Sequence, residues 1–409
     1  MESNFFNYAE KLEKLGFFNN KIGYLLIKQT KLMRKIIGLT FMVFMAFVRI
    51  NAQENPNPIT TATPFLLIAP DARAGGMGDV GVATSPDANS QHWNASKFAF
   101  MDSQFMLGIV YTPWLRELTN DVFLGGFTYA NRIDDRSAWA ASLKYFNLGQ
   151  IDLTDINGTP EGTEKLNEFS VDGSYALKLS ETYSMGVTLR YIRSDLGIES
   201  ANSTISPVNT FAVDVSGYYV SNEQRYGNVN GVWRGGFNIS NIGPKVSYTN
   251  DGQENFIPTN LKVGGGFDFI LDRSNNVSIN LEFNKLLVPT PSVSINDDGE
   301  APYRQEEVNF FEGIFKSFGD APGGSGEELK EVTWGLGAEY MYDNSFALRA
   351  GYFNESDLKG SRKYFTVGTG FKFKSSKIDI SYLFNSSEIK NPLENTLRFS
   401  LSFDFGRSY

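Results

Sequence analysis

Hydrophobic and polar residues alternate with a period of two along most of the chain after Gln104. In the stretch 397–405, apolar side chains occupy the odd positions, and polar side chains from Arg398 to Asp404 occupy the even ones. Successive side chains of a β-strand point to opposite faces, so each such stretch has one apolar and one polar face. The pattern therefore predicts strands that separate an apolar environment from a polar one.

Fourteen stretches of this kind follow one another, and bacterial single-chain barrels have an even number of strands. The predicted strands are 104–111, 122–131, 137–148, 168–179, 183–194, 210–220, 232–239, 260–270, 276–284, 332–342, 345–353, 363–373, 377–384 and 396–405.

The links between the predicted strands alternate in length. They are short after even-numbered strands, as at 134–136 and 343–344, with the longer link 221–231 as an exception. They are long after odd-numbered strands, and the longest covers 285–331. Short periplasmic turns and long extracellular loops are typical of outer-membrane barrels. The sequence thus predicts a 14-stranded antiparallel transmembrane β-barrel. Aromatic residues near strand ends, such as Trp139, fit interfacial girdles and disfavour the alternative of a soluble all-β protein.

The stretch from Pro64 to Asn94 has a different composition. A short apolar run is followed by closely spaced glycines, small residues and charges. Glycine allows close backbone approach, and charged side chains are costly in lipid but not in a polar lumen. We expect this stretch to form a plug inside the barrel. Its candidate site residues are Asp71, Arg73, Gly75, Gly76, Met77, Gly78, Asp79, His92 and Asn94.

The wording of residues 70–94, PDARAGGMGDVGVATSPDANSQHWN, resembles the N-terminal signature of the PorV family of the Bacteroidetes type IX secretion system. That family usually continues with Asn-Pro-Ala, whereas this chain has Asn94, Ala95 and Ser96. PorV proteins are a branch of the FadL-like barrels, so the resemblance implies an N-terminal hatch in the lumen.

The resemblance also implies a function. Proteins similar to PorV collect cargo with a C-terminal signal domain at the translocon channel subunit and shuttle it to an attachment complex. There, a sortase removes the signal and couples the cargo to lipopolysaccharide. The implied role is binding in the outer membrane, without catalysis or cofactor. The loops 195–209, 240–259 and 285–331 are the expected partner-binding regions.

The first residues have the features of a targeting signal. Arg34 and Lys35 precede an apolar run from Ile36 to Val48, and Ala52 precedes a plausible cleavage point. We expect an upstream extension over 1–32, a signal peptide over 33–52, the plug over 53–103 and the barrel over 104–409.

Few residues suit enzymatic chemistry. The chain has no cysteine and one histidine, His92, so neither a triad nor a His/Cys metal site is expected. A hydrogen bond from His92 to the wall is the favoured interpretation. The net charge of −9 argues against nucleic acid as a partner.

Strand parity points a mixed set of charges into the lumen, where they are expected to pair with one another or with Asp71, Arg73 and Asp79. These lumen-facing residues are Lys144, Asp172, Arg190, Asp214, Asp268, Glu282, Glu339, Arg349, Asp379, Arg398 and Asp404.

The longest loop contains a predicted helix over 305–318. Its apolar residues recur at spacings of three and four and share one face: Val308, Phe311, Ile314, Phe315 and Phe318. This face would pack as a lid on the barrel mouth or dock another protein.

Two other functions remain open. A FadL-like transporter of fatty acids or other hydrophobic small molecules would have the same fold, and it would need an apolar route to a gap in the wall. A structural or lipopolysaccharide-modifying barrel is a third reading.

Overall fold

The computed structural model describes residues 56–115, 119, 121–154, 157–196, 199–200, 203–204, 206–227, 229–249, 254–293, 303–304, 308–387 and 395–406. The predicted upstream extension 1–32 and signal peptide 33–52 lie outside these residues. The chain from Pro56 onward forms one compact unit.

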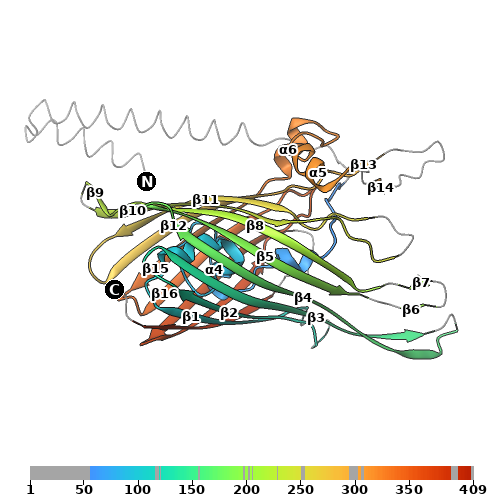
Figure 1. Ribbon diagram of the computed structural model, residues 1–409, viewed down its shortest axis with the longest axis horizontal. Helices are drawn as coiled ribbons and strands as arrows, with labels where there is room; N and C mark the ends of the chain where they lie inside the picture. Colours follow the sequence, from blue (N-terminus) through green and yellow to red (C-terminus); the bar gives the residue numbers. More distant parts are fainter. Residues whose placement is uncertain are drawn as a thin grey trace, which may run out of the picture. The chain divides into compact units, whose positions relative to one another are not determined.

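Fourteen antiparallel strands form a closed barrel (Figure 1), which confirms the predicted architecture. Each strand pairs with its neighbours in sequence, and the first pairs with the last to close the wall. The strands are β1 (Phe105–Pro113), β2 (Phe123–Arg132), β3 (Ser137–Thr154), β4 (Pro160–Lys178), β5 (Tyr183–Asp195), β8 (Val208–Val220), β10 (Val229–Ile242), β11 (Asn260–Ile270), β12 (Asn275–Leu286), β15 (Thr333–Tyr342), β16 (Phe346–Asn354), β17 (Lys363–Phe373), β18 (Ser376–Asn385) and β19 (Leu397–Phe405).

The two faces of the wall differ as the alternation predicted. On β12, the side chains of Ile279, Leu281 and Phe283 are 44%, 39% and 45% exposed, whereas Asn280 and Glu282 between them are buried. The apolar residues therefore face outward, and the polar residues face the lumen.

Two strands are longer than predicted. β3 continues to Thr154, and β4 begins at Pro160, so the predicted loop 149–167 is mostly a hairpin extension. Its β4 part carries polar residues on both faces, for example Glu164 and Lys165, and its β3 part has only two apolar residues, Ile151 and Leu153. Alternation reveals a strand only where one face is apolar, so the sequence pattern could not show it.

The links after even-numbered strands lie at one end of the barrel, and those after odd-numbered strands lie at the other, as predicted. The barrel therefore has a turn end and a loop end. At the turn end, Asp343 and Asn344 both have positive φ, 49° and 50°, as a two-residue hairpin turn requires. The long even-numbered link contains β9 (Gln224–Tyr226), which pairs with β10. Within the loops lie two short hairpins, β6 (Glu199–Ser200) with β7 (Ser203–Thr204), and β13 (Ser292–Val293) with β14 (Tyr303–Arg304).

Aromatic side chains on the outer face mark two levels of the wall. Near the loop end, Trp334 on β15 and Tyr352 on β16 have ring centroids 5.6 Å apart, and Phe365 on β17 is 4.7 Å from Tyr352. Near the turn end, Tyr129 lies 5.3 Å from Trp139. Such girdles sit at the two interfaces of the bilayer, so the apolar band between them is the lipid-facing region.

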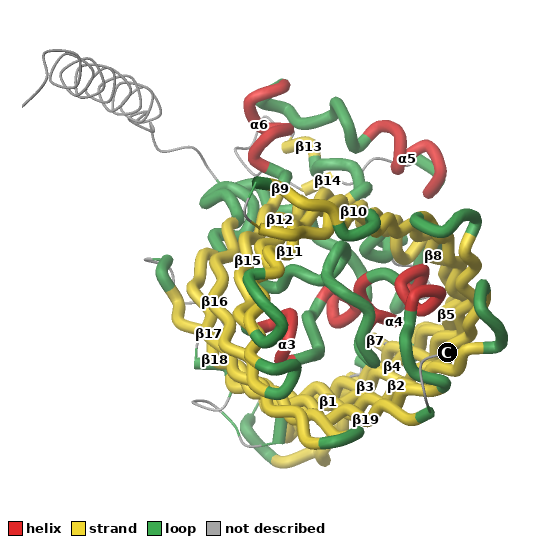
Figure 2. The backbone as a smooth tube through the Cα atoms, turned by 90° about the vertical axis from the view of Figure 1, so that its left-hand side faces the viewer, coloured by secondary structure: helices red, strands yellow, loops and turns green. Residues whose placement is uncertain are grey.

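Short helices lie in two places (Figure 2). η1 (Pro64–Leu67), α3 (Ala72–Gly75), α4 (Ser90–Trp93) and η2 (Ala95–Phe100) precede β1, and α3 and α4 are seen within the ring of strands. α5 (Phe310–Lys316) and α6 (Ser325–Lys330) lie outside the ring. The predicted loop helix 305–318 is thus shorter in the described part, with 305–307 outside it, and α6 was not predicted. Of the helices in the described ranges, none has the length and apolar character to cross a membrane.

Candidate functional site

Residues 56–103, called the inner segment below, begin at the loop end of the barrel. The backbone N–H of Asn57 donates to the Leu358 carbonyl in the β16–β17 loop at 2.8 Å, and its side chain donates to Glu327 of α6 at 3.1 Å. The Ala62 N–H donates to the Phe256 carbonyl in the β10–β11 loop. Since all three loops belong to the loop end, the segment passes into the lumen from that side.

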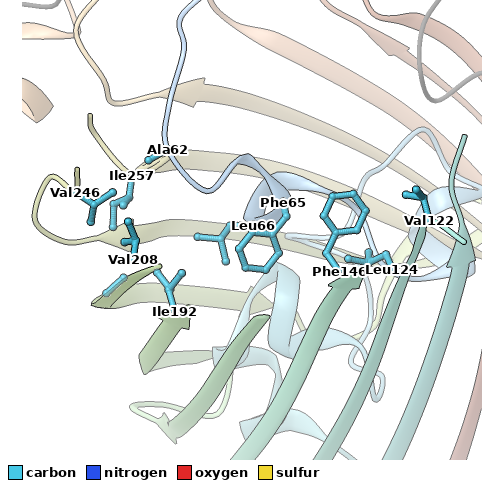
Figure 3. Packing of buried hydrophobic residues seen from close by; sticks show 11 residues of the cluster. Ala62, Phe65, Leu66, Val122, Leu124, Phe146, Ile192, Val208, Val246 and Ile257 are labelled. Atoms are coloured by element: carbon cyan, nitrogen blue, oxygen red, sulfur yellow. The ribbon is translucent and has the colours of Figure 1, made fainter. Parts of the chain in front are cut away.

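Apolar packing holds the first turn of the segment below the loops. Phe65 and Leu66 of η1 are buried and pack with wall and loop residues such as Phe146 on β3 and Ile192 on β5 (Figure 3). The apolar run that the sequence showed at 64–68 therefore packs within the protein instead of facing lipid.

Asp71 organises the segment itself. Its Oδ1 accepts from the Ala74 N–H at 2.9 Å and so caps α3, while Oδ2 accepts from the indole N–H of Trp93 at 2.6 Å. The sequence suggested Asp71 as a partner for lumen charges, but its direct hydrogen bonds are local. A carboxylate placed just before a helix is drawn to that helix's free N–H groups.

Arg73 joins the segment to the wall. Its Nη2 and Nε donate to the Glu339 carboxylate on β15 at 2.9 and 3.2 Å, and Nη1 lies 2.8 Å from Asp87. Arg349 on β16 also holds Glu339, at 2.6 Å. The Arg73 side chain is 7% exposed, so this is a buried, charge-assisted network of the kind that the charge pattern suggested.

The glycines that follow α3 allow contact between the segment's backbone and the wall's backbone. A Cβ at Gly76 would lie 3.0 Å from the Cα of Gly368 on β17. Gly78 has φ +72°, and a Cβ there would lie 2.7 Å from the backbone of Tyr352. On the wall, a Cβ at Gly351 would lie 2.1 Å from the Gly78 nitrogen. The interface has no room for side chains on either side, which explains the Gly75–Gly78 motif physically. Met77 between the glycines is buried.

Asp79 makes a second ionic contact with the wall. It accepts from Arg398 of β19 and from the Tyr364 hydroxyl of β17, each at 2.6 Å. Two and three positions further on, the N–H groups of Gly81 and Val82 both donate to the Glu282 carboxylate of β12 at 2.8 Å. The predicted inward charges of the wall thus meet the segment's charges and its free backbone donors.

His92 is bonded to the wall. Its Nδ1 lies 2.9 Å from Nζ of Lys144 on β3. Because an ammonium group only donates, Nδ1 accepts, and the imidazole is neutral with its proton on Nε2. Nε2 is buried without a hydrogen-bond partner among the described residues, and the ring packs edge-on against Trp93. This geometry is structural and provides no nucleophile for the histidine to activate.

Asn94 ends the motif. Its side-chain amide donates to the carbonyls of Val82 and of Gly217 on β8, and its oxygen accepts from the Ser96 N–H. Ala95 is the first residue of η2, a position that also suits proline, so the departure from Asn-Pro-Ala leaves the turn intact.

Several contacts were not anticipated from the sequence. Lys97 is fully buried and donates to the Gly81 carbonyl and the Thr84 hydroxyl, each at 3.0 Å. Neutral side chains, including Ser184 and Asn238, complete the ring of hydrogen bonds. The wall strands that bond the inner segment are β1, β3, β4, β5, β8, β10, β12, β15, β17 and β19. In the sequence, only their inward positions on the alternating strands mark these wall residues. Such positions do not show whether a residue bonds the inner segment or is solvated in the lumen.

A cavity of about 710 Å³ lies on the loop side of the inner segment. One part of its lining is apolar and aromatic, with Phe65, Trp114 and Phe146, and another part carries Lys262 and Arg362. A second cavity, of about 560 Å³, reaches the turn end and is lined by charged residues that include Arg73, Asp87 and Lys377. The inner segment lines both cavities.

The predicted loop-helix residues lie elsewhere. Phe311, Phe315 and Phe318 are 59%, 76% and 54% exposed, and Val308 and Ile314 are partly buried. None of the five lines the cavity at the loop end. The apolar face of the predicted helix therefore does not line this cavity. Within the described ranges, no group of three or more His, Asp or Glu residues is arranged to hold a metal ion.

The chain is similar to several solved structures. A Pseudomonas aeruginosa FadL homologue is 10% identical with a TM-score of 0.42, over 86% of this chain and 100% of that chain. The Pseudomonas putida toluene transporter TodX is 13% identical with a TM-score of 0.46, over 86% of this chain and 98% of that chain. The Ralstonia pickettii toluene transporter TbuX is 11% identical with a TM-score of 0.46, over 83% and 98%. No curated protein matches the chain.

One family model matches, and it covers the inner segment and the wall as far as β13. It is described as type IX secretion system protein PorV, and the match spans residues 51–293, more than half of the chain. The closed barrel and this match together identify an outer-membrane protein of type IX secretion. The chain belongs to the PorV family.

Proposed function

We propose that this protein is the cargo shuttle of a type IX secretion system. It binds cargo with a C-terminal signal domain at the translocon channel subunit, diffuses in the outer membrane and delivers the cargo to the sortase-containing attachment complex. Its role is binding, without a cofactor. The family match is the observation that carries this proposal.

The way in which the inner segment is held supports a binding role over a conduit. We propose that this segment is a hatch that stays closed during function. It is bonded to strands on every side of the lumen, and two buried ionic contacts, Arg73–Glu339 and Asp79–Arg398, fix its middle. In the described wall, every strand is paired with both neighbours. A shuttle of this kind works with its outer surface.

We place the partner surface at the loop end, which is the extracellular side of an outer-membrane barrel. Three parts of the chain lie at this end. The hatch begins between the loops at Asn57, the β3–β4 hairpin extends outward to Thr154, and the loop after β12 carries α5 and α6. The loops 195–209 and 240–259 complete this surface.

Deletion of the gene, followed by complementation, tests the shuttle. Without the protein, cargo bearing its C-terminal signal should accumulate uncleaved in the periplasm, and the full chain should restore surface attachment. A complementing chain that lacks the part of the β3–β4 hairpin beyond Gly149 tests more specifically whether the loop end binds the partners. Normal cleavage and attachment of cargo in the deletion strain would refute the proposal.

A second candidate is a transporter of hydrophobic small molecules, and the loop-end cavity favours it. The cavity is large enough for a small ligand, and Trp93 and Trp114 line it. If it binds such ligands, addition of a fatty acid to the purified protein should change tryptophan fluorescence, and the deletion strain should grow poorly on a hydrophobic nutrient. Normal growth together with stalled cargo would leave the shuttle as the function.

A further inference from the structure

The loop after β12 carries an amphipathic helix whose apolar face is turned away from the protein. In α5, one residue advances the helix by about 100°. Phe311 and Phe315 therefore share one side of α5, and Gly313 lies opposite them; Phe318 follows in the turn after the helix. Gly313 is buried, and a Cβ at this position would lie 2.6 Å from the Phe256 ring and 3.2 Å from Pro289. The helix thus packs on the protein through its glycine side, and its phenylalanines point outward.

The loop reaches the outer face of the wall at one position of β12. On β12, Ile279, Leu281 and Phe283 point to the lipid, and Lys285 has the same parity. Yet Lys285 is only 9% exposed, because Glu328 and Glu331 at α6 pair with it at 3.1 and 2.7 Å. The Phe318 ring centroid lies 6.0 Å from the Lys285 Nζ. A lipid-side position of the wall is therefore covered by this loop, in agreement with the place of α5 and α6 outside the ring in Figure 2.

The height of the helices relative to the bilayer follows from the aromatic girdle. Phe283 pairs in register with Trp334, whose ring is 5.6 Å from Tyr352 in the loop-end girdle. Lys285 is two residues beyond Phe283, or about 7 Å along the strand. Lys285, and the Phe318 ring near it, thus lie just beyond the level at which the apolar band of the wall ends.

We propose that α5 and α6 form an interfacial anchor, with Phe311, Phe315, Phe318 and Leu329 turned toward the boundary between the head groups and the acyl chains of the outer leaflet. These four side chains are 54–76% exposed. In water they would form a large exposed apolar patch, and such patches mark sites that a partner or a membrane covers. A helix that lies in the interface with its apolar side toward the acyl chains has this arrangement. The surface is continuous with the lipid-facing band of β12, so lipid is the occupant that the position favours. The anchor rests on the barrel lying in lipid and does not depend on cargo binding.

The cysteine-free chain allows a direct test with single labels. Phe315→Cys and Lys316→Cys place a nitroxide on two sides of the same helix, and Phe283→Cys places one on the lipid-facing wall. The proteins are reconstituted in vesicles of phosphatidylethanolamine and phosphatidylglycerol, and collision rates with oxygen and with a nickel chelate are measured. The label at Phe315 should favour oxygen, like that at Phe283, whereas the label at Lys316 should favour the chelate.

Two outcomes would overturn the anchor. If the label at Phe315 collides with the chelate as often as the label at Lys316, the helix is solvated. If it does so in vesicles but is shielded from both reagents in native outer membranes, another protein covers this face instead of lipid. Heat-modifiable migration of each labelled protein on gels verifies that the barrel is folded.

Discussion

Removal of the Arg73 side chain should loosen the hatch. In Arg73→Ala, the Glu339 carboxylate loses two hydrogen bonds, of 2.9 and 3.2 Å, and Asp87 loses its 2.8 Å partner. Loss of one partner of a buried ion pair costs about 3–5 kcal/mol. Arg349 still holds Glu339 at 2.6 Å, so the lower end of that range applies.

About 3 kcal/mol corresponds to a roughly 100-fold larger population in which the hatch around α3 leaves the wall. Each such departure joins the loop-end cavity to the charged cavity at the turn end, since the hatch lines both. The assay is single-channel recording in planar bilayers. Arg73→Ala should show about 100-fold more frequent openings than the wild-type protein.

Two matched variants control the experiment. Arg136→Ala removes an exposed arginine in a turn and should leave the trace unchanged. Arg73→Lys retains the charge but not the two-pronged contact with Glu339, so an intermediate frequency is expected. Equal opening frequencies for wild type and Arg73→Ala, with both barrels folded, would refute the view that this network seals the lumen.

Two further perturbations probe the hatch and the loop. Gly351→Ala places a Cβ 2.1 Å from the Gly78 backbone and should displace the hatch, seen as lower heat stability of the folded barrel on gels; Gly173→Ala, with no atom within 4 Å, should not. Burial and the charges of Glu328 and Glu331 raise the pKa of Asp320 to about 6. The folded loop thus binds a proton at a higher pH than the unfolded loop does, so its stability should rise as the pH falls from 7 to 5. Amide exchange in the loop, corrected for intrinsic rates, should slow over that range in the wild type but not in Asp320→Asn.

Strand positions were largely predictable because lipid and lumen impose opposite chemistry on alternate residues. β11 and β17 begin and end at the predicted residues. The boundaries of the other strands, apart from β3 and β4, differ from the predicted ones by a few residues. The outer parts of β3 and β4 were missed because they project beyond the band, where no apolar face is required.

The contacts of the hatch were predictable only in kind. The sequence indicated that Arg73 and Asp79 would meet inward charges of the wall, and both do. Their choice of Glu339 and Arg398 depends on how strands distant in sequence are placed around the lumen, which a single sequence does not encode locally. Asp71 differs from the expectation because a nearby helix terminus competes for it.

The loop helix shows another limit of sequence patterns. Periodicity predicted an apolar face, but not the side on which it would lie. The burial of Gly313 against Phe256 decides the orientation, and Phe256 belongs to a different loop.

A hatch locked to the wall tests the central claim most directly, which is that cargo is handled by a barrel whose lumen stays closed. Ala88→Cys with Gly108→Cys joins the hatch to β1, since a Cβ at Gly108 would lie 3.1 Å from that of Ala88. A small shift brings this separation to the roughly 3.5–4.5 Å of a disulfide. The measurement is surface attachment of cargo in cells that have only this variant, compared with each single-cysteine variant and with reduced cells. We predict normal attachment with the disulfide formed. Uncleaved cargo in the periplasm of the oxidised double variant alone would contradict the account.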